Sequence, residues 1–340
     1  MNPKRRIIPI FIPHKGCGHD CVFCDQHTIS GMIFPSSAPD VSKAIREFED
    51  SGDKSHPVEI AFYGGSFTAI PEQTQIDLLE AAGPLLALNP LNSIRISTRP
   101  DCIDSAIISR LKNYGVATIE LGAQSMRDET LSASHRGHTA LHVEQAAALV
   151  KSAGVSLILQ MMTGLPGDTA EGALHTARQF IDLNPDGVRI YPTVVIYGTQ
   201  LYEMWKRGEY LEHTVEEAIA LCSQLVSMFE NASIPVIRLG LNPSDGLSSG
   251  GVAAGAYHPA FGELVYSNLY YKKAASLLKG MNPGSDITIV VPKGRVSRMI
   301  GIGRQNIEKL KIDFSLRSIK VIESENGYRP GGSGIVLFLA

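Results

Sequence analysis

Strand-like and helix-like segments alternate along most of this chain, and that alternation restricts the fold more than any other feature. Six short apolar runs rich in branched residues are followed by longer stretches with apolar residues at helical spacing. The runs occupy Ile7 to Ile12, Val58 to Tyr63, Ser93 to Thr98, Ala117 to Leu121, Val155 to Met162 and Gly187 to Val195. A repeated strand, helix, strand order predicts a parallel sheet with helices outside it. This number of units favours an α/β fold with a partial or complete TIM-like (β/α) barrel.

A cysteine-rich segment, HKGCGHDCVFCDQH, directly follows the first apolar run. In a parallel barrel the reactive groups lie at the carboxyl ends of the strands, so we expect this segment on that face. It holds Cys17, Cys21 and Cys24 in a CxxxCxxC array. Five cysteines in 340 residues are too few, and odd in number, for a disulfide-stapled secreted scaffold. The other two, Cys102 and Cys222, stand alone, and we expect them to serve packing.

Three thiols at this spacing are compatible with more than one chemistry. They suit an iron-sulfur cluster in which three irons are held by cysteines and the fourth iron stays open. Structural zinc wants four ligands, and His14, His19 or His27 could supply the fourth. The paired CxxC knuckles usual for zinc are not present in the sequence. Unliganded cysteines are the third alternative. The spacing alone favours the cluster.

Further motifs resemble the radical S-adenosylmethionine (SAM) superfamily. Phe23 precedes the last cysteine of the array, and the second run ends in YGGSF. The resemblance implies that Gly64 and Gly65 form a turn whose backbone meets the methionine part of SAM, because only glycine lets a main chain approach so closely. It also implies a 4Fe-4S cluster held by Cys17, Cys21 and Cys24.

Residues 5 to 265 are similar, more narrowly, to the catalytic domain of the Elongator catalytic subunit, which acts on transfer-RNA wobble uridine. The motifs are ISTRPD, IELGAQSM, SHRGHT, LQMMTGLPGDT and RIYPTVVIYGTQLYEMWKRGEY. A more distant resemblance is to oxygen-independent coproporphyrinogen oxidase. The resemblance implies cofactor contacts from Phe23, Gln124, Arg136, which would pair with the SAM carboxylate, and Gln160 and Thr98, near the ribose. Arg99 and Tyr191 are expected to face the substrate. Plainer alternatives are a surface ion pair for Arg136 and a buried backbone partner for Gln160.

The resemblance also implies the reaction. A reduced cluster would donate one electron to SAM, and the resulting 5'-deoxyadenosyl radical would abstract hydrogen from the substrate. A one-electron donor such as ferredoxin or flavodoxin would be needed. Elongator-type proteins carry a C-terminal acetyltransferase domain, and the last 55 or so residues here are too few for one. We therefore expect the radical half of the reaction without the acyl transfer.

The strand and helix rhythm ends near residue 240. We expect a core barrel over 1–240, a Gly, Ser and Pro-rich connection with a helix over 241–285, and a small separate domain over 286–340. The last part carries nine Lys or Arg against five Asp or Glu, whereas the preceding 285 residues carry 22 against 29. The formal net charge of the whole chain is only -3, so a basic tail is joined to an acidic body.

The tail resembles a KH domain, in which two helices joined by a GxxG loop clamp single-stranded nucleic acid. RMIGIGRQNIEKL fits this pattern except that Arg304 stands where the last glycine is expected. The resemblance implies a small α+β domain that binds RNA through residues around the loop. These are Lys293, Arg295, Arg298, Gly301, Gly303, Arg304 and Lys309. The alternative is a structural cap that only packs on the barrel or dimerises.

Three hypotheses follow for the function. The first is a radical SAM enzyme whose KH-like tail presents RNA, above all transfer RNA, to the barrel. The second is a radical SAM enzyme acting on a small molecule, as coproporphyrinogen oxidase does, with the tail as a cap. The third is a non-enzymatic RNA-binding protein with structural zinc. The N-terminal apolar run is short and broken by Pro9 and Pro13, and no run reaches membrane-spanning length, so we expect a cytoplasmic protein without a membrane partner.

Overall fold

The computed structural model describes residues 6–12, 15–18, 20–31, 36–51, 56–324 and 336–339. Two of the three histidines considered above as a zinc ligand, His14 and His19, lie outside the described residues. Part of the predicted tail domain, 325–335, also lies outside them. Within the described residues no helix is both long and apolar enough to cross a membrane.

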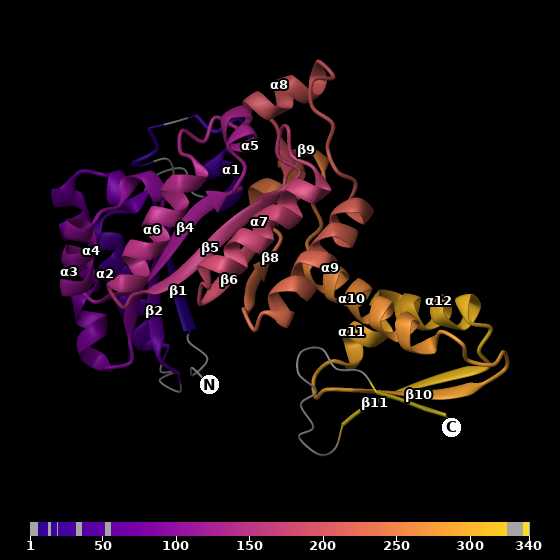
Figure 1. The fold of residues 1–340 in the computed structure, drawn as a ribbon. Helices are drawn as coiled ribbons and strands as arrows, with labels where there is room; N and C mark the ends of the chain where they lie inside the picture. Colours follow the sequence, from indigo (N-terminus) through magenta and orange to yellow (C-terminus); the bar gives the residue numbers. More distant parts are fainter. Residues whose placement is uncertain are drawn as a thin grey trace.

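Seven parallel strands form one sheet that curls into a half-barrel (Figure 1), which confirms the prediction of a partial barrel. The strands follow one another across the sheet in chain order, so each crossover packs a helix beside the next strand. They are β1 (Arg6–Phe11), β2 (Val58–Tyr63), β3 (Ser93–Thr98), β4 (Val116–Gln124), β5 (Ser156–Thr163), β6 (Gly187–Pro192) and β8 (Val236–Leu239).

Helices cover the convex side of this sheet (Figure 1). They are α2 (Ala38–Asp50), α3 (Glu72–Leu88), α4 (Ser105–Asn113), α6 (Ala140–Ser152), α7 (Ala170–Leu183) and α9 (Val215–Asn231). Alternate strand residues, such as Ile60 and Phe62, pack against them in one continuous apolar core. The chain marks the helix ends locally: Thr214 and Glu217 form a capping box at the start of α9, and Asn184 ends α7 in the left-handed conformation.

Shorter elements gather at the carboxyl ends of the strands. They are α1 (Gln26–Ser30), α5 (Asp128–Ala133), α8 (Gln200–Lys206), the 3-10 turns η1 (Phe67–Ala69) and η2 (Pro100–Cys102), and a two-stranded ribbon of β7 (Val194–Ile196) and β9 (Val252–Gly255). Figure 1 shows α1, α5, α8 and β9 together at this end of the half-barrel. We call this end the mouth.

Two sequence predictions need correction here. The run Gly187 to Val195 is not one strand, because β6 ends at Pro192 and β7 begins at Val194. Pro192 has no amide proton to extend the pairing towards β8, although the Thr193 amide still donates to the Thr163 carbonyl of β5. The following residues turn to pair antiparallel with β9. The Gly and Ser-rich stretch after residue 240, predicted to be a loop, contains β9 and the helical turn η3 (Leu247–Gly251). The edge strand β8 was not predicted at all, since its four residues are too few to show a period.

The tail folds as a strand, a helix, a turn, a helix and a strand, so its two helices are joined by the loop that the sequence indicates. The elements are β10 (Asp286–Val291), α11 (Val296–Ile300), the turn η4 (Ile302–Arg304), α12 (Gln305–Asp313) and β11 (Ser318–Glu323), followed by β12 (Val336–Leu339). Strand β10 lies in the middle of the small sheet, parallel to β11 and antiparallel to β12. This is the α+β unit expected from the sequence.

One long helix, α10 (Phe261–Leu278), belongs to both parts of the molecule. Its first half places Phe261, Val265 and Leu269 in the barrel core. Its second half places Tyr270 and other residues in the separate core of the tail. The helix predicted as part of a connection is therefore a structural element that the two cores share, and Figure 1 shows the tail attached along it.

Candidate active site at the barrel mouth

The cysteine loop begins by packing backbone against backbone on the YGGSF turn. The Ser66 amide donates to the Lys15 carbonyl over 2.9 Å. A Cβ at Gly65 would lie 2.2 Å from the Lys15 oxygen, and one at Gly16 would lie 2.2 Å from the Ser66 oxygen. Only glycine fits at either position, because any side chain would push the two segments apart. Gly65 thus holds the cysteine loop at the carboxyl end of β2, while Gly64 makes the turn with φ of 102°.

The end of the loop is fixed to two other elements of the mouth. The Val22 amide donates to the Ser134 carbonyl after α5, and the Leu201 amide of α8 donates to the Val22 carbonyl over 2.7 Å. Phe23, predicted to contact the cofactor, is buried with Val22 and Leu201 in a small apolar cluster beneath the loop. The cluster includes parts of Cys21 and Cys24, so it excludes water from one side of the thiols.

The three predicted metal ligands lie together on this loop. Cys17 is exposed and Cys21 and Cys24 are partly buried; like Cys102 and Cys222, they are free thiols. Burial, followed by the neighbouring Cys21 and Cys17, raises the pKa of the Cys24 thiol to about 12. Burial and Cys21 also raise the pKa of Cys17. These thiols resist ionisation because a buried thiolate charge is unfavourable. A bound metal centre supplies the positive charge that offsets this cost.

Among the described residues, no three His, Cys, Asp or Glu side chains lie at distances that would hold a metal ion. The donor set and its position fit a centre held by three thiolates, but the sulfurs must draw together to hold it. His27 is exposed on α1 and joins no such group within the described residues.

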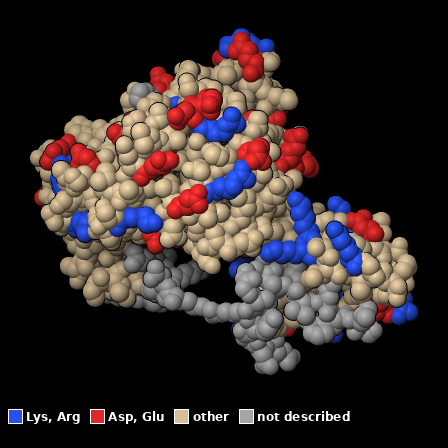
Figure 2. Space-filling view, viewed as in Figure 1, with Lys and Arg blue, Asp and Glu red and all other residues tan. Residues whose placement is uncertain are grey.

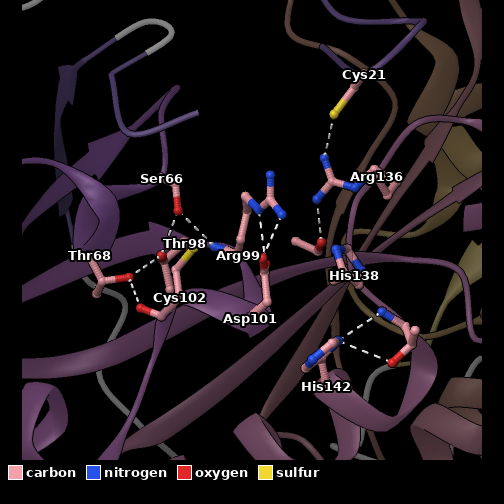
Figure 3. A network of polar contacts seen from close by, with 12 residues as sticks. Cys21, Ser66, Thr68, Thr98, Arg99, Asp101, Cys102, Arg136, His138 and His142 are labelled. Atoms are coloured by element: carbon pink, nitrogen blue, oxygen red, sulfur yellow. Dashed lines mark hydrogen bonds and ion pairs between the residues drawn. The ribbon is translucent and has the colours of Figure 1, made fainter. Parts of the chain in front are cut away.

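Arg136 connects the cysteine loop to β4. Its side chain is buried, and Nη1 donates to the Cys21 sulfur over 3.1 Å while Nη2 donates to the Gly122 carbonyl over 2.7 Å (Figure 3). Its Nε is also buried and has no hydrogen-bond partner among the described residues. A surface ion pair, the plainer alternative considered for Arg136, does not fit this buried position. The free Nε leaves donor capacity for an anionic group bound at the mouth.

A second guanidinium, that of Arg99, directly follows β3. It makes a bidentate pair with Asp101, over 2.9 Å from Nε and 2.6 Å from Nη2 (Figure 3). The charges of Arg136 and Arg99 both act to lower the pKa of Cys17, against the larger effect of burial. Arg99 was predicted to face the substrate, and the structure places it close enough to act on the thiols.

Thr98 is buried within a chain of hydroxyl groups (Figure 3). Its Oγ1 lies 3.0 Å from the Ser66 Oγ and 2.6 Å from the Thr68 Oγ1. Ser66 also accepts from the Arg99 amide over 3.2 Å. These contacts tie the YGGSF turn to the end of β3, so the geometry gives Thr98 a positioning role, whereas its predicted ribose contact is not tested.

Gln124 and Gln160, the predicted polar contacts on β4 and β5, are hydrogen-bonded to each other. The Gln160 Nε2 donates to the Gln124 Oε1 over 3.2 Å. Gln124 has φ of 67°, a left-handed conformation that is strained for any residue other than glycine, at a bulge in the β4–β5 pairing. Such strain persists where the surroundings hold a side chain in a required direction, and Gln124 therefore stays a candidate functional residue.

His138 is a buried residue of the site that the sequence analysis did not single out. Its Nε2 lies 3.1 Å from the Ala123 carbonyl, and Nδ1 has no partner within the described residues. Burial, followed by the charge of Arg136, lowers the pKa of His138 to about 4. The imidazole is therefore neutral near pH 7. Its position in SHRGHT, two residues from Arg136, was the available signal.

The concave side of the sheet is lined by a network of charged side chains that the sequence analysis also missed. Glu120 accepts from Arg95 over 2.5 Å and from Arg189 over 2.8 Å. Glu59 accepts from Arg95 over 2.7 Å. Arg189 also donates to the hydroxyls of Tyr63 and Tyr191. Charged residues at alternate positions of otherwise apolar strands were the signal, since they all point to the face opposite the helices.

The tail loop takes the geometry of a glycine-rich turn in spite of Arg304. Gly301, Gly303 and Arg304 all have positive φ, of 77°, 59° and 64°. A Cβ at Gly301 would lie 2.9 Å from the Ser267 Oγ of α10. Arg304 thus holds a left-handed conformation at the start of α12, at a cost of roughly 1 kcal/mol, with an exposed side chain.

The predicted RNA-binding cations differ in whether their side chains already contact other residues. Arg298 stacks 3.8 Å from the Tyr266 ring and donates to Glu263, so it docks α11 on α10. Lys309 lies over the Tyr271 ring. Lys293, Arg295 and Arg304 are exposed. Figure 2 shows Lys and Arg side chains gathered where the tail meets the barrel.

Comparison with known proteins identifies the family of the barrel. Residues 11–180 match the model of the radical SAM superfamily, and residues 185–271 match the radical SAM C-terminal domain. The first match covers all three loop cysteines and runs from the last residue of β1 through β5 and into α7.

Similar proteins point to the same group. The tRNA uridine(34) acetyltransferase of Methanocaldococcus jannaschii is 29% identical over 262 residues, which are 65% of this chain and 48% of that protein. Human Elongator complex protein 3 is 28% identical over 250 residues, covering 62% of this chain and 46% of that protein. The solved structure of Methanocaldococcus infernus Elp3 with an N-terminal deletion aligns with a TM-score of 0.63 at 25% identity, over 80% of this chain and 64% of that one. The chain spans about half the length of the curated relatives it matches.

Proposed function

The chain belongs to the radical SAM superfamily, and on this premise we propose that it is an RNA-modifying enzyme acting on transfer RNA. Enzymes of this family use a 4Fe-4S cluster and SAM. The observation that carries the RNA proposal is the tail loop, where Arg304 keeps a glycine conformation and points an exposed cation outward. The names of the relatives add support, since they are described as acting on tRNA uridine.

The cluster and SAM, when bound, supply the electron transfer and the radical that starts the reaction. Cys17, Cys21 and Cys24 would hold the cluster, because they are three free thiols on one loop at the mouth. The apolar packing around Phe23 would shield one side of it from water.

The remaining residues of the mouth would bind and orient SAM. Gly64 and Gly65 bring the turn close to the cysteine loop. Arg136 has a buried Nε–H without a described partner, which suits the carboxylate that the sequence analysis assigned to it. The strained Gln124 and its partner Gln160 would present amide groups to the ribose. Thr98, through Ser66, would keep the turn in place.

Binding of RNA would begin at the tail and end at the mouth. Arg304, Lys293 and Arg295 are exposed cations that can contact phosphates, whereas Arg298 and Lys309 are engaged by aromatic rings of α10. Because α10 is part of both cores, RNA held at the tail would keep a fixed orientation towards the barrel. A ferredoxin or flavodoxin as electron donor, and a cytoplasmic location, complete the proposal.

The test uses the full chain, reconstituted anaerobically with iron and sulfide. Reduced enzyme and SAM should release 5'-deoxyadenosine, and purified transfer RNA should stimulate that release and acquire a new nucleoside detectable by mass spectrometry. Arg304→Gly should weaken transfer-RNA binding and reduce its salt dependence, whereas Arg207→Gln, just after α8, should leave both unchanged. RNA would be rejected as the substrate if transfer RNA did not change the release of 5'-deoxyadenosine and both variants bound transfer RNA equally well.

A small-molecule substrate is the second candidate, and one observation favours it. Arg298, expected among the RNA contacts, is instead used to fix the tail to α10 through Glu263 and Tyr266. A tail that only caps the barrel would use Arg298 in this way and would need no contact with RNA. The family assignment favours either enzyme over the non-enzymatic zinc protein considered above.

A further inference from the structure

The concave charge network leaves one of its arginines without a carboxylate. Glu59 accepts from Arg95, Ser93 and Thr118, and Glu120 accepts from Arg95, Arg189 and Ser97. Both carboxylates are therefore used by Arg95 and Arg189. No third carboxylate pairs with the next arginine on this face, Arg238 of β8, among the described residues.

Arg238 lies beside Arg189 in the sheet. The two are partners in the pairing of β6 with β8, so their side chains leave the same face. Arg238 is partly buried, and its one hydrogen bond within the described part of the chain runs from Nε to the Gly240 carbonyl, over 3.0 Å. Burial lowers the pKa of Arg238; Tyr191 acts in the opposite direction and Arg189 adds to the lowering. An anion bound next to this guanidinium would stabilise its charged form.

Tyr191 of β6 is oriented to help bind such an anion. Its hydroxyl oxygen accepts from the Arg189 Nη1 over 3.2 Å. A hydroxyl that accepts from a cation points its own proton elsewhere, and no described residue accepts that proton. Tyr191 and Arg238 are the last residues but one of their strands, so both lie near the mouth. They also lie at the opposite edge of the sheet from β1, which leads into the cysteine loop.

We propose that Arg238 and Tyr191 form a binding site for an oxyanion of the substrate, namely a phosphodiester of the RNA segment that enters the half-barrel. This inference rests on the proposed function for the choice of phosphate over carboxylate. The guanidinium fork matches the two oxygens of either group, and the Tyr191 hydroxyl adds a third donor. A substrate anchored at β6 and β8 spans the mouth and turns its other end towards the cysteine loop. Arg238 and Tyr191 therefore set which part of the substrate faces the cofactor.

The experiment compares a small probe with a phosphate, the same nucleoside without it, and a dicarboxylate. Uridine 5'-monophosphate, uridine and succinate are titrated calorimetrically into the full-length, anaerobically reconstituted protein with SAM. We expect the monophosphate to bind more tightly than uridine. Arg238→Gln should reduce that preference about tenfold or more, the size expected for a charged hydrogen bond. Arg238→Lys should restore part of it, and Tyr191→Phe should lose part of it. The matched control is Arg207→Gln, whose side chain is exposed and paired with Glu209.

The outcomes separate this inference from the proposed function. Succinate that binds more tightly than the monophosphate, with the same dependence on Arg238, supports the oxyanion site and moves the substrate to a carboxylate-bearing small molecule. Equal binding of uridine and its monophosphate overturns the site. The site is also overturned if Arg238→Gln keeps the preference for the monophosphate over uridine, or if no probe binds at millimolar concentration. Circular dichroism of each variant checks the fold, and the Lys and Phe variants keep the test informative if the Gln variant unfolds.

Discussion

The Arg136 guanidinium donates a hydrogen bond to the Cys21 sulfur across 3.1 Å. A positive donor at a ligand sulfur stabilises the extra electron of a reduced iron-sulfur cluster. We expect Arg136→Gln to lower the midpoint potential and Arg136→Lys to lower it less. A redox titration followed by electron paramagnetic resonance, without SAM, measures this directly. An unchanged potential in Arg136→Gln would show that the contact is lost when the cluster binds.

Replacement of any loop cysteine should remove the cluster. The reconstituted chain should bind about four irons and be brown, and Cys17→Ala, Cys21→Ala or Cys24→Ala should abolish the colour and most of the iron. Cys102→Ala is the matched control, because that thiol lies after β3, outside the loop. Iron analysis and visible absorption check the result. A colourless wild-type protein with a single zinc would contradict the iron-sulfur assignment.

Gly65→Ala should damage the mouth without disturbing the rest of the barrel. The new Cβ would lie 2.2 Å from the Lys15 carbonyl oxygen, so the cysteine loop must move away. Overpacking of this kind costs typically 1–3 kcal/mol. Gly83→Ala, inside α3 with nothing within 4 Å of its new Cβ, should instead be neutral or stabilising. Thermal unfolding and iron content of the two variants give the comparison, and equal iron content would contradict the close packing.

Glu120→Gln should strongly destabilise the barrel. The Glu120 carboxylate is buried and accepts from Arg95 and Arg189, so its neutralisation leaves two guanidinium groups without their shared partner. Breaking a buried pair in this way costs about 3–5 kcal/mol. Glu209→Gln, which breaks the exposed pair with Arg207, should cost far less, because water already screens that pair. Urea denaturation measures both free energies, and similar values would mean that water screens the concave network.

Acid should destabilise the protein through His138. Its pKa is lowered from 6.5 to about 4 in the folded state, so the unfolded chain binds the proton first as the pH falls. Stability from the neutral imidazole is complete above pH 6.5 and is lost as the pH falls towards 4, by up to about 3 kcal/mol. His138→Gln should flatten this part of the stability profile. Denaturation midpoints at half-unit pH steps test it.

The sequence was sufficient to predict the repeating strands and helices, because each of them has its own spacing of apolar residues. Residues such as Ile60, Phe62, Ile94 and Ile96 face the helices as alternation requires. It also placed the cysteines at the mouth, since a loop after a parallel strand can emerge only there. The end of β6 shows where local periodicity is not enough, since residues 194–196 continue the apolar run but form β7, which pairs with the distant β9.

The side-chain partners could not be predicted, because they depend on how segments distant in the sequence meet. Nothing in SHRGHT indicates that Arg136 reaches Cys21, which lies 115 residues earlier. The charged network was visible as Glu59, Arg95 and Arg189 within apolar runs, yet its pairing depends on the order of strands in the sheet. The cost of burying these charges is tolerated only because the strands bring opposite charges together.

Helix α10 has a consequence for how the two parts of the chain could be separated. A cut between Tyr270 and the tail would strip apolar residues from one hydrophobic core and strand them in solvent, and a cut before Phe261 would do the same to the other. Neither piece is then expected to stay soluble as an isolated fragment. A recombination event that transplants the tail onto another barrel must carry the whole helix, together with a surface shaped to receive its first half.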